Sequence, residues 1–169
     1  MLILCDSYNI PLLFLVDQPG FLIGLEAERR KIAGKVINWM YALSLVTVPK
    51  LTLITRKDYG QALVNMGGAD TADAIAAWWS AEISFMDPRS ALFVVDGIEP
   101  DPRSREYVAR VEAMSRSSTS YDLAGVYGAH DVIDPARSRE WVSGQLRTLL
   151  RRRTNGVADH RLSNWPTTF

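Results

Sequence analysis

The sequence predicts an α/β fold built on a parallel sheet, because short apolar runs of strand length alternate with segments of helical periodicity. Three runs carry the strand signal: Leu12–Val16, Leu51–Thr55 and Ala74–Trp79. A long amphipathic segment separates the first two, and a second helical pattern follows Gly60. Strands that alternate with helices in this way are typical of parallel sheets with crossover helices, so we expect one domain over residues 1–169.

The composition limits the kind of partner. The chain has 47% hydrophobic residues, and its 19 basic side chains balance its 19 acidic ones. This balance gives no electrostatic case for binding nucleic acid or a membrane surface. The single cysteine, Cys5, excludes an internal disulfide, and we expect it to be a buried, inert thiol. No apolar run reaches the roughly 20 residues that span a membrane and no signal peptide is visible, so we expect a cytoplasmic protein.

The first elements are a helix and a strand. Met1–Tyr8 has the pattern of the last turns of an amphipathic helix, and Pro11 disfavours helix at the preceding residue. Leu12–Val16 is a continuous apolar run, which predicts a strand buried on both faces. Asp17–Gly20 breaks the run, and a loop continues to Gly24.

Leu25–Leu45 is the longest periodic segment and predicts one helix. Its apolar residues form a single stripe, and Glu26 and Glu28 suit the positive end of the helix dipole. The basic run Arg29–Lys31 fits a solvated helix face better than a phosphate site.

Val48–Gly68 predicts a strand, a tight turn and a helix, and the rest of the chain is organised around it. The strand is Leu51–Thr55, the charged residues Arg56–Asp58 are expected to form the turn, and a helical pattern follows Gly60. The first N–H groups of such a helix have no intrahelical partner. They can therefore hold an oxyanion or a polarised carbonyl, and a glycine lets a ligand approach the backbone closely.

The second half of the chain continues the alternation of elements. Glu82 is interpreted as structural, and His130 as a neutral, partly buried side chain. The C-terminal Trp165–Phe169 is expected to dock on this fold or on another subunit. Further expected elements are a short helix at Pro88–Val95, an amphipathic helix at Arg103–Met114, a polar loop at Ser115–Ser120, strand fragments at Val126–Tyr127 and Val132–Ile133, and a helix capped by Ser138.

The sequence lacks the residue patterns of several common kinds of catalytic site. The two histidines, His130 and His160, do not have the spacing of metal ligands, and only one cysteine is present. The sequence contains no nucleophile elbow, phosphate-binding loop or dinucleotide-binding fingerprint. We therefore expect no metal site and no side-chain nucleophile.

Four segments, in order along the chain, resemble motifs of one family. Val48–Gly60 is similar to VPKxTxIxRKxYG of the carboxyltransferase in biotin-dependent acyl-CoA carboxylases, and Leu15–Gly24 is similar to its LVDxPGFxxG loop. Trp78–Ile83 resembles its WPxAEI segment, and Asp131–Arg139 its DVIDPxxTR segment. The resemblance covers nearly the whole chain. It implies a crotonase-like β-superhelix of ββα units, with the opening strands of the family missing.

The resemblance also implies where the chemistry takes place. Carboxyltransferases of this family use backbone N–H groups to stabilise the urea oxygen of biotin, at the helix that follows the Tyr-Gly pair. The matching backbone amides here are those of Gly60, Gln61 and Ala62. Residues expected to border the biotin are Pro19, Gly20, Phe21 and Tyr59.

The resemblance implies that the chain is the biotin-side half of a carboxyltransferase that moves CO2 from carboxybiotin to an acyl-CoA. The biotin would arrive on a biotin carboxyl carrier protein, and an N-terminal carboxyltransferase half or subunit would complete the site, within a homo- or hetero-oligomer. Two alternatives stay open. One is a non-catalytic relative that serves as an assembly subunit, which departures from the family pattern at Gly34, Lys35, Gln61 and Trp79 favour. The other is a crotonase-like acyl-CoA hydrolase or isomerase.

Overall fold

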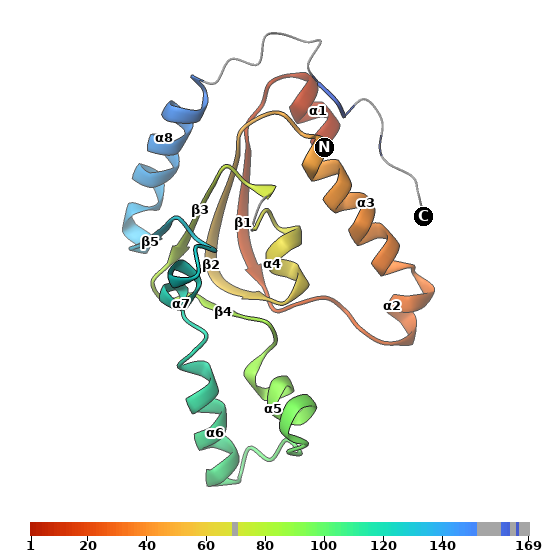
Figure 1. Ribbon diagram of the computed structural model, residues 1–169, viewed down its shortest axis with the longest axis vertical. Helices are drawn as coiled ribbons and strands as arrows, with labels where there is room; N and C mark the ends of the chain where they lie inside the picture. Colours follow the sequence, from red (N-terminus) through yellow and green to blue (C-terminus); the bar gives the residue numbers. More distant parts are fainter. Residues whose placement is uncertain (69–70, 152–159, 163–164, 166–169) are drawn as a thin grey trace.

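A computed structural model describes residues 1–68, 71–151, 160–162 and 165 of the chain (Figure 1). Helices and strands alternate along it, as the sequence predicts. In chain order they are α1 (Leu2–Ser7), β1 (Leu12–Gln18), α2 (Leu25–Arg29), α3 (Ile32–Leu45), β2 (Lys50–Tyr59), α4 (Gln61–Asn65), β3 (Ala74–Trp78), β4 (Glu82–Ser84), α5 (Pro88–Asp96), α6 (Arg105–Ser115), α7 (Ser120–Gly125), β5 (Asp131–Ile133), a 3-10 turn η2 (Pro135–Arg137) and α8 (Ser138–Leu149).

The strands form one parallel sheet in the order β1-β2-β3-β5, and the short β4 pairs with the far end of β2. β2 is the longest strand and contacts three others. Residues Leu51 to Ile54 pair with β3, whereas Lys57 to Tyr59 pair with β4. The predicted parallel sheet is therefore confirmed, and β2 carries the chain directly into Gly60.

One face of the sheet is covered by α1, α3 and α4. Leu12 on β1 packs with Ala42 and Leu43 of α3 in one buried cluster. Val16 and Ile54 lie in a second cluster, against which Leu63 and Met66 of α4 also pack. These two clusters form the core, and the fully buried Thr52 ties it to α4 through a 2.7 Å hydrogen bond to the Gly67 carbonyl.

The other face of the sheet is only partly covered. Asp131 of β5 accepts a hydrogen bond from the indole of Trp141 on α8, and its strand register places it on the same face as Leu15. α8 does not cover β1, because Leu13 is 44% exposed and Leu15 62% exposed. The expectation that Leu12–Val16 is buried on both faces is therefore wrong. In the described part of the chain, β1 also pairs only with β2 and so lies at a sheet edge.

Two boundaries in the first half differ from the prediction. The expected single helix over Leu25–Leu45 is two helices, because Lys31 adopts a left-handed conformation with φ 54° and ends the first one. Arg56–Asp58 is not a turn but the continuation of β2, held by its pairing with β4. A charged run in a strand was mistaken for a turn because β4 is only three residues long and gave no sequence signal.

The second half holds a helix that the sequence analysis missed. α7 begins at a capping box in which the Thr119 hydroxyl accepts from the Asp122 amide, and the Asp122 carboxylate accepts from Thr119. The expected strand at Val126–Tyr127 is wrong, since Val126 ends this helix and Tyr127 has φ 60°. Ser138 is the first residue of α8 rather than its cap, and its hydroxyl accepts a bond from the Trp78 indole.

The chain ends partly outside the described residues. Of the predicted docking segment Trp165–Phe169, the structure describes Trp165, whose ring centroid lies 6.2 Å from that of Trp39 on α3. Just before it, His160 Nδ1 lies 3.3 Å from Asp6 of α1. Cys5 is buried, as expected. Within the described ranges, no helix combines the length and apolar character that crossing a bilayer requires.

Candidate functional site

The candidate site lies where β2 ends and α4 begins. Gly60 occupies the helix N-cap with φ 63°, a conformation that glycine adopts at little cost. A Cβ at this position would lie 2.8 Å from the carbonyl oxygen of Phe85. The turn thus depends on glycine both for its dihedral angles and for the space beside the chain.

The three predicted backbone donors are not equivalent. The Gly60 amide donates to the Ser84 carbonyl at 2.8 Å, which extends the ladder between β2 and β4. Ala62 is fully buried, whereas Gln61 is exposed. The first hydrogen bond of the turn runs from the Leu63 amide to the Gly60 carbonyl, and the Gln61 amide has no partner among the described residues. Of these three amides, only that of Gln61 is therefore available to a ligand in this conformation. The Gly60 amide is used by the sheet, so Gly60 forms the turn and does not donate to a ligand as expected.

An apolar groove adjoins Gln61. It consists of two neighbouring hollows of about 390 and 310 Å³ that share Phe21, Ile32 and Val36 in their walls. Gln61 and Met40 border the first hollow, and the Gln61 side-chain amide donates to the Met40 sulfur at 3.5 Å. Residues that border the second are Gln18, Lys35, Trp39, Asn65 and Met66. We call this the Phe21 groove.

The fold brings some predicted cofactor residues to this groove and not others. Phe21 lies in the wall of both hollows and shares the first of them with Gln61. Pro19 and Gly20 precede Phe21 in the loop but do not line the hollows. Tyr59 is 2% exposed, and its hydroxyl donates to Glu82 at 2.7 Å, so it does not face the groove. Burial and the neighbouring Glu82 carboxylate raise the pKa of Tyr59 above its ordinary value.

Two buried polar groups near the site were missed by the sequence analysis. Asp58 is fully buried, its carboxylate has no hydrogen-bond partner among the described residues, and burial raises its pKa to about 7. Asn65 is 4% exposed, and neither polar atom of its carboxamide has a hydrogen-bond partner in the described part of the chain. Its backbone carbonyl accepts a 2.6 Å bond from the Trp39 indole. A buried asparagine without partners beside a groove is a signal that only the packed structure provides.

Other charged groups around the site have structural roles. Arg56 forms an exposed ion pair with Asp17 at 2.9 Å, and this guanidinium lowers the pKa of Asp17. Nδ1 of His130, an exposed side chain, accepts a bond from the Ile75 amide. No group of three or more His, Cys, Asp or Glu side chains in the described part of the chain is arranged to hold a metal ion.

Fold and groove together define an α/β protein that offers a ligand apolar walls, side-chain amides and an exposed backbone donor. Comparison with known proteins identifies the class. The chain belongs to the carboxyl transferase domain family, whose model matches residues 1–162.

Two similar relatives are named as carboxyltransferase subunits. The chain is 40% identical over 147 residues to the methylmalonyl-CoA carboxyltransferase 12S subunit of Propionibacterium freudenreichii subsp. shermanii. The aligned region covers 84% of this chain and 28% of the relative. It is 38% identical over 169 residues to the propionyl-CoA carboxylase carboxyltransferase subunit of Haloferax mediterranei, covering 96% of this chain and 32% of the relative.

The solved structures agree with this assignment. The crystal structure of transcarboxylase 12S, described as a hexamer assembly, matches with a TM-score of 0.82 at 37% identity, over 98% of this chain and 32% of that one. The solved relatives are crotonase-fold carboxyltransferases, which confirms the predicted fold class. The chain thus spans about a third of the length of the relatives that it matches.

Proposed function

We propose that this chain supplies the biotin-side part of a carboxyltransferase site that transfers a carboxyl group from carboxybiotin to an acyl-CoA. The observation that carries the proposal is the backbone amide of the exposed residue Gln61, which has no partner among the described residues, at the rim of an apolar groove. A preorganised backbone donor of this kind contributes about 3 kcal/mol when negative charge develops on the oxygen that it faces. The apolar walls keep water away and so strengthen that contribution.

The residues of the Phe21 groove fit the chemistry of biotin. Phe21, Ile32 and Val36 offer apolar surface to its fused rings and its alkyl chain. Biotin, when bound, supplies the carboxyl group that is transferred. The chain itself binds the ring system, excludes water and stabilises charge through Gln61.

The partners follow from the same proposal. Biotin reaches such a site on a carrier protein, so the open rim of the groove would receive a biotin carboxyl carrier protein. The acyl-CoA and its own oxyanion cradle would come from the part of the carboxyltransferase that corresponds to the unmatched two thirds of the relatives. The complete enzyme would then be an oligomer of such units.

Binding of biocytin, the biotin–lysine conjugate, tests the proposal without requiring turnover. Gln61 is the first residue of α4, where proline is tolerated because its missing N–H has no helical partner. Gln61→Pro therefore removes the proposed donor and leaves the helix intact. We expect it to weaken biocytin binding about fivefold or more, measured by amide shifts in NMR titrations.

Gln61→Ala is the matched control, because it keeps the backbone N–H and removes only the side chain. It is expected to bind biocytin within about twofold of the unchanged chain. Equal binding by Gln61→Pro and Gln61→Ala would contradict the role of the amide, and saturable binding of lysine without biotin would contradict the ligand.

A further inference from the structure

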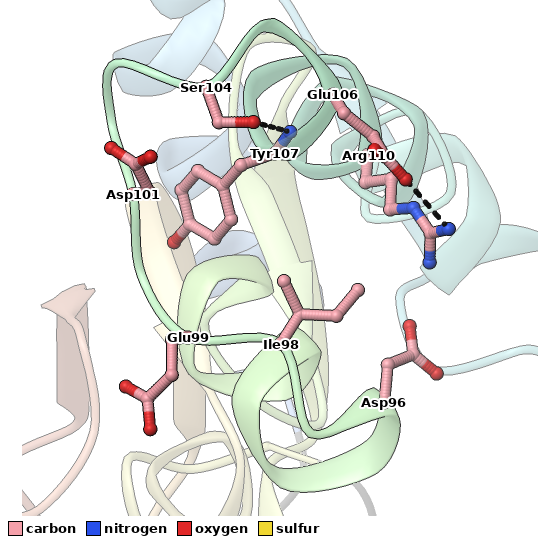
Figure 2. Close-up of a pocket in the computed structure, with 8 residues that line it drawn as sticks. All are labelled: Asp96, Ile98, Glu99, Asp101, Ser104, Glu106, Tyr107 and Arg110. Carbon is pink, nitrogen blue, oxygen red and sulfur yellow. Dashed lines mark hydrogen bonds and ion pairs between the residues drawn. The ribbon is translucent and has the colours of Figure 1, made fainter.

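Two regions outside the Phe21 groove differ in how they are connected to it. The first is a pocket of about 440 Å³ between α5 and α6, in which Glu106 pairs with Arg110 at 3.1 Å (Figure 2). This pocket shares no lining residue with the groove. The second region consists of residues 160–162 and 165, which we call the C-terminal segment. It contacts Trp39, and Trp39 lines the second hollow of the groove.

His160 anchors the C-terminal segment to α1 and to the chain just before β2. Its Nδ1 lies 2.9 Å from the Thr47 hydroxyl oxygen and 3.3 Å from Asp6. The Thr47 hydroxyl donates its hydrogen to Asp6 at 2.9 Å, so this hydroxyl can only accept from His160. His160 therefore carries a hydrogen on Nδ1 and donates it to Thr47. Asp6 is fully buried and also accepts from the Thr47 amide at 2.7 Å, which ties this network to the backbone.

Leu162 continues the anchor into the core. It is 1% exposed and belongs to the buried cluster that contains Leu2 and Cys5 of α1 and Leu43 of α3. Figure 1 shows residues 160–162 beside α1. Because burial removes nearly all of the leucine side chain from water, this part of the C-terminal segment is held by the hydrophobic core.

Trp165 connects the C-terminal segment to the groove. Its ring centroid lies 6.2 Å from that of Trp39, with 46° between the ring planes, within the range of favourable aromatic pairs. Trp39 donates its indole N–H to the Asn65 carbonyl at 2.6 Å. Asn65 is the last residue of α4, and Gln61 is the first. A continuous series of contacts thus links Trp165, through Trp39, to the helix that bears Gln61.

We propose that Trp165 is a positioning residue for the Phe21 groove. Trp39 is only partly buried, so a neighbouring ring that restricts it keeps the wall of the second hollow in one arrangement. It also keeps the Trp39 indole on the Asn65 carbonyl and so holds the end of α4. A wall that is ordered before the ligand arrives reduces the entropy that binding loses. The effect on the ligand rests on the proposed function, whereas the effect on Trp39 does not.

Biocytin titrations test the effect on the ligand. Trp165→Ala is expected to weaken binding by about three- to tenfold, the equivalent of one lost aromatic contact. Trp165→Phe keeps an aromatic ring and should bind within about twofold of the unchanged chain. Trp79→Ala, at a 55% exposed tryptophan that lines neither hollow, is the matched control and should leave binding unchanged. Thermal melts confirm that each variant folds.

Hydrogen exchange of the Trp39 indole N–H tests the positioning without any ligand. This N–H is protected by its bond to Asn65, so loosening of Trp39 makes it exchange faster. Trp165→Ala is expected to speed the exchange by about threefold or more. The Trp141 indole N–H, which donates to Asp131 at 2.7 Å, is the internal control and should exchange at an unchanged rate.

Two substitutions of His160 test the anchor. His160→Leu removes the donor to Thr47 and is expected to speed exchange at Trp39 as Trp165→Ala does. His160→Asn, whose side-chain amide can place an N–H near the position of Nδ1, should keep exchange close to that of the unchanged chain. Equally fast exchange in both variants would contradict the assigned donor, and an unchanged rate in both would contradict the anchor.

The two measurements separate this inference from the proposed function. Failure of the unchanged chain to bind biocytin would contradict the proposed function, and the exchange rates would still decide whether Trp165 positions Trp39. An unchanged exchange rate of the Trp39 indole in Trp165→Ala would overturn the inference. Unchanged biocytin affinity in Trp165→Ala, in a chain that binds biocytin, would overturn it as well.

Discussion

The Tyr59 hydroxyl donates a 2.7 Å hydrogen bond to the Glu82 carboxylate, and this contact joins the end of β2 to the start of β4. Tyr59 is buried by the same arrangement, just before the turn at Gly60. The sequence motif alone suggests that this tyrosine borders biotin. In the structure, Tyr59 instead holds the end of β2 against β4, next to the turn that leads to Gln61.

Tyr59→Phe is expected to lower the free energy of unfolding by about 1 kcal/mol, because it removes one partly buried hydrogen bond. Biocytin binding should stay unchanged. Urea unfolding and the NMR titration measure the two quantities, and Tyr127→Phe, at a 95% exposed tyrosine, is the control. Loss of biocytin binding without loss of stability would restore Tyr59 as a cofactor residue.

Asp58 makes the stability of the chain depend on pH. Its pKa is about 7 when folded, against 3.8 for an ordinary aspartate, so the folded state holds more protons between these values. The contribution of Asp58 to the free energy of unfolding should therefore be highest below pH 4 and fall as the pH rises toward 7, by up to about 1.4 kcal/mol per pH unit. Above pH 7 this contribution has been lost.

Asp58→Asn removes the titrating group while keeping its shape. The free energy of unfolding of this variant, relative to that of the unchanged chain, should increase from pH 5 to pH 8. Urea unfolding at each pH measures this difference. Asp96→Asn, at an exposed aspartate, is the control. A difference for Asp58→Asn that stays flat across this range would contradict the burial of an unpaired carboxyl.

Gly60→Val should disrupt the turn between β2 and α4. Its Cβ would lie 2.8 Å from the Phe85 carbonyl oxygen, and a β-branched residue is strained at φ 63°. We expect a loss of about 1–3 kcal/mol in unfolding free energy, together with loss of biocytin binding. Gly125→Ala, where a Cβ meets nothing within 4 Å, is the control. A Gly60→Val chain that binds biocytin normally would exclude the proposed site.

The edge strand β1 should drive self-association. Leu13 and Leu15 are exposed on a sheet face beside an edge that no described residue pairs. Sedimentation of the 169-residue chain at rising concentration should show oligomers or aggregates. Leu15→Lys should reduce them, whereas Val126→Lys, at an exposed position away from the sheet, should not. A monomer at high concentration would argue against an uncovered β1.

The 169-residue chain alone is expected not to carboxylate acyl-CoA, even when carboxybiotin is supplied. Transfer needs stabilised charge on both biotin and thioester, and the chain offers a candidate donor only for the first. Loss of a whole cradle costs on the order of a thousandfold in rate. Adding the remaining part of a relative's carboxyltransferase should restore transfer, measured with labelled bicarbonate-derived carboxybiotin. Robust carboxylation by the chain alone would require a second cradle within these residues.

The sequence determined the order of the elements and the turn at Gly60. Short apolar runs of strand length predict β1, β2 and β3, since buried strands need apolar residues wherever they lie in a sheet. Glycine after a strand and before a helical pattern predicts the N-cap, because the required dihedral angle is local. The family motifs predicted the fold class, which the solved relatives confirm.

Tertiary packing decided which groups of the site are available. Tyr59 and Ala62 are buried and Gly60 is paired with Ser84, because β4 packs beside β2, and β4 is too short to be seen in the sequence. Burial without a partner likewise gives Asp58 its raised pKa, which no local pattern encodes. Phe21 and Gln61 line the same hollow although they are 40 positions apart in the sequence, and only the folded chain brings them together.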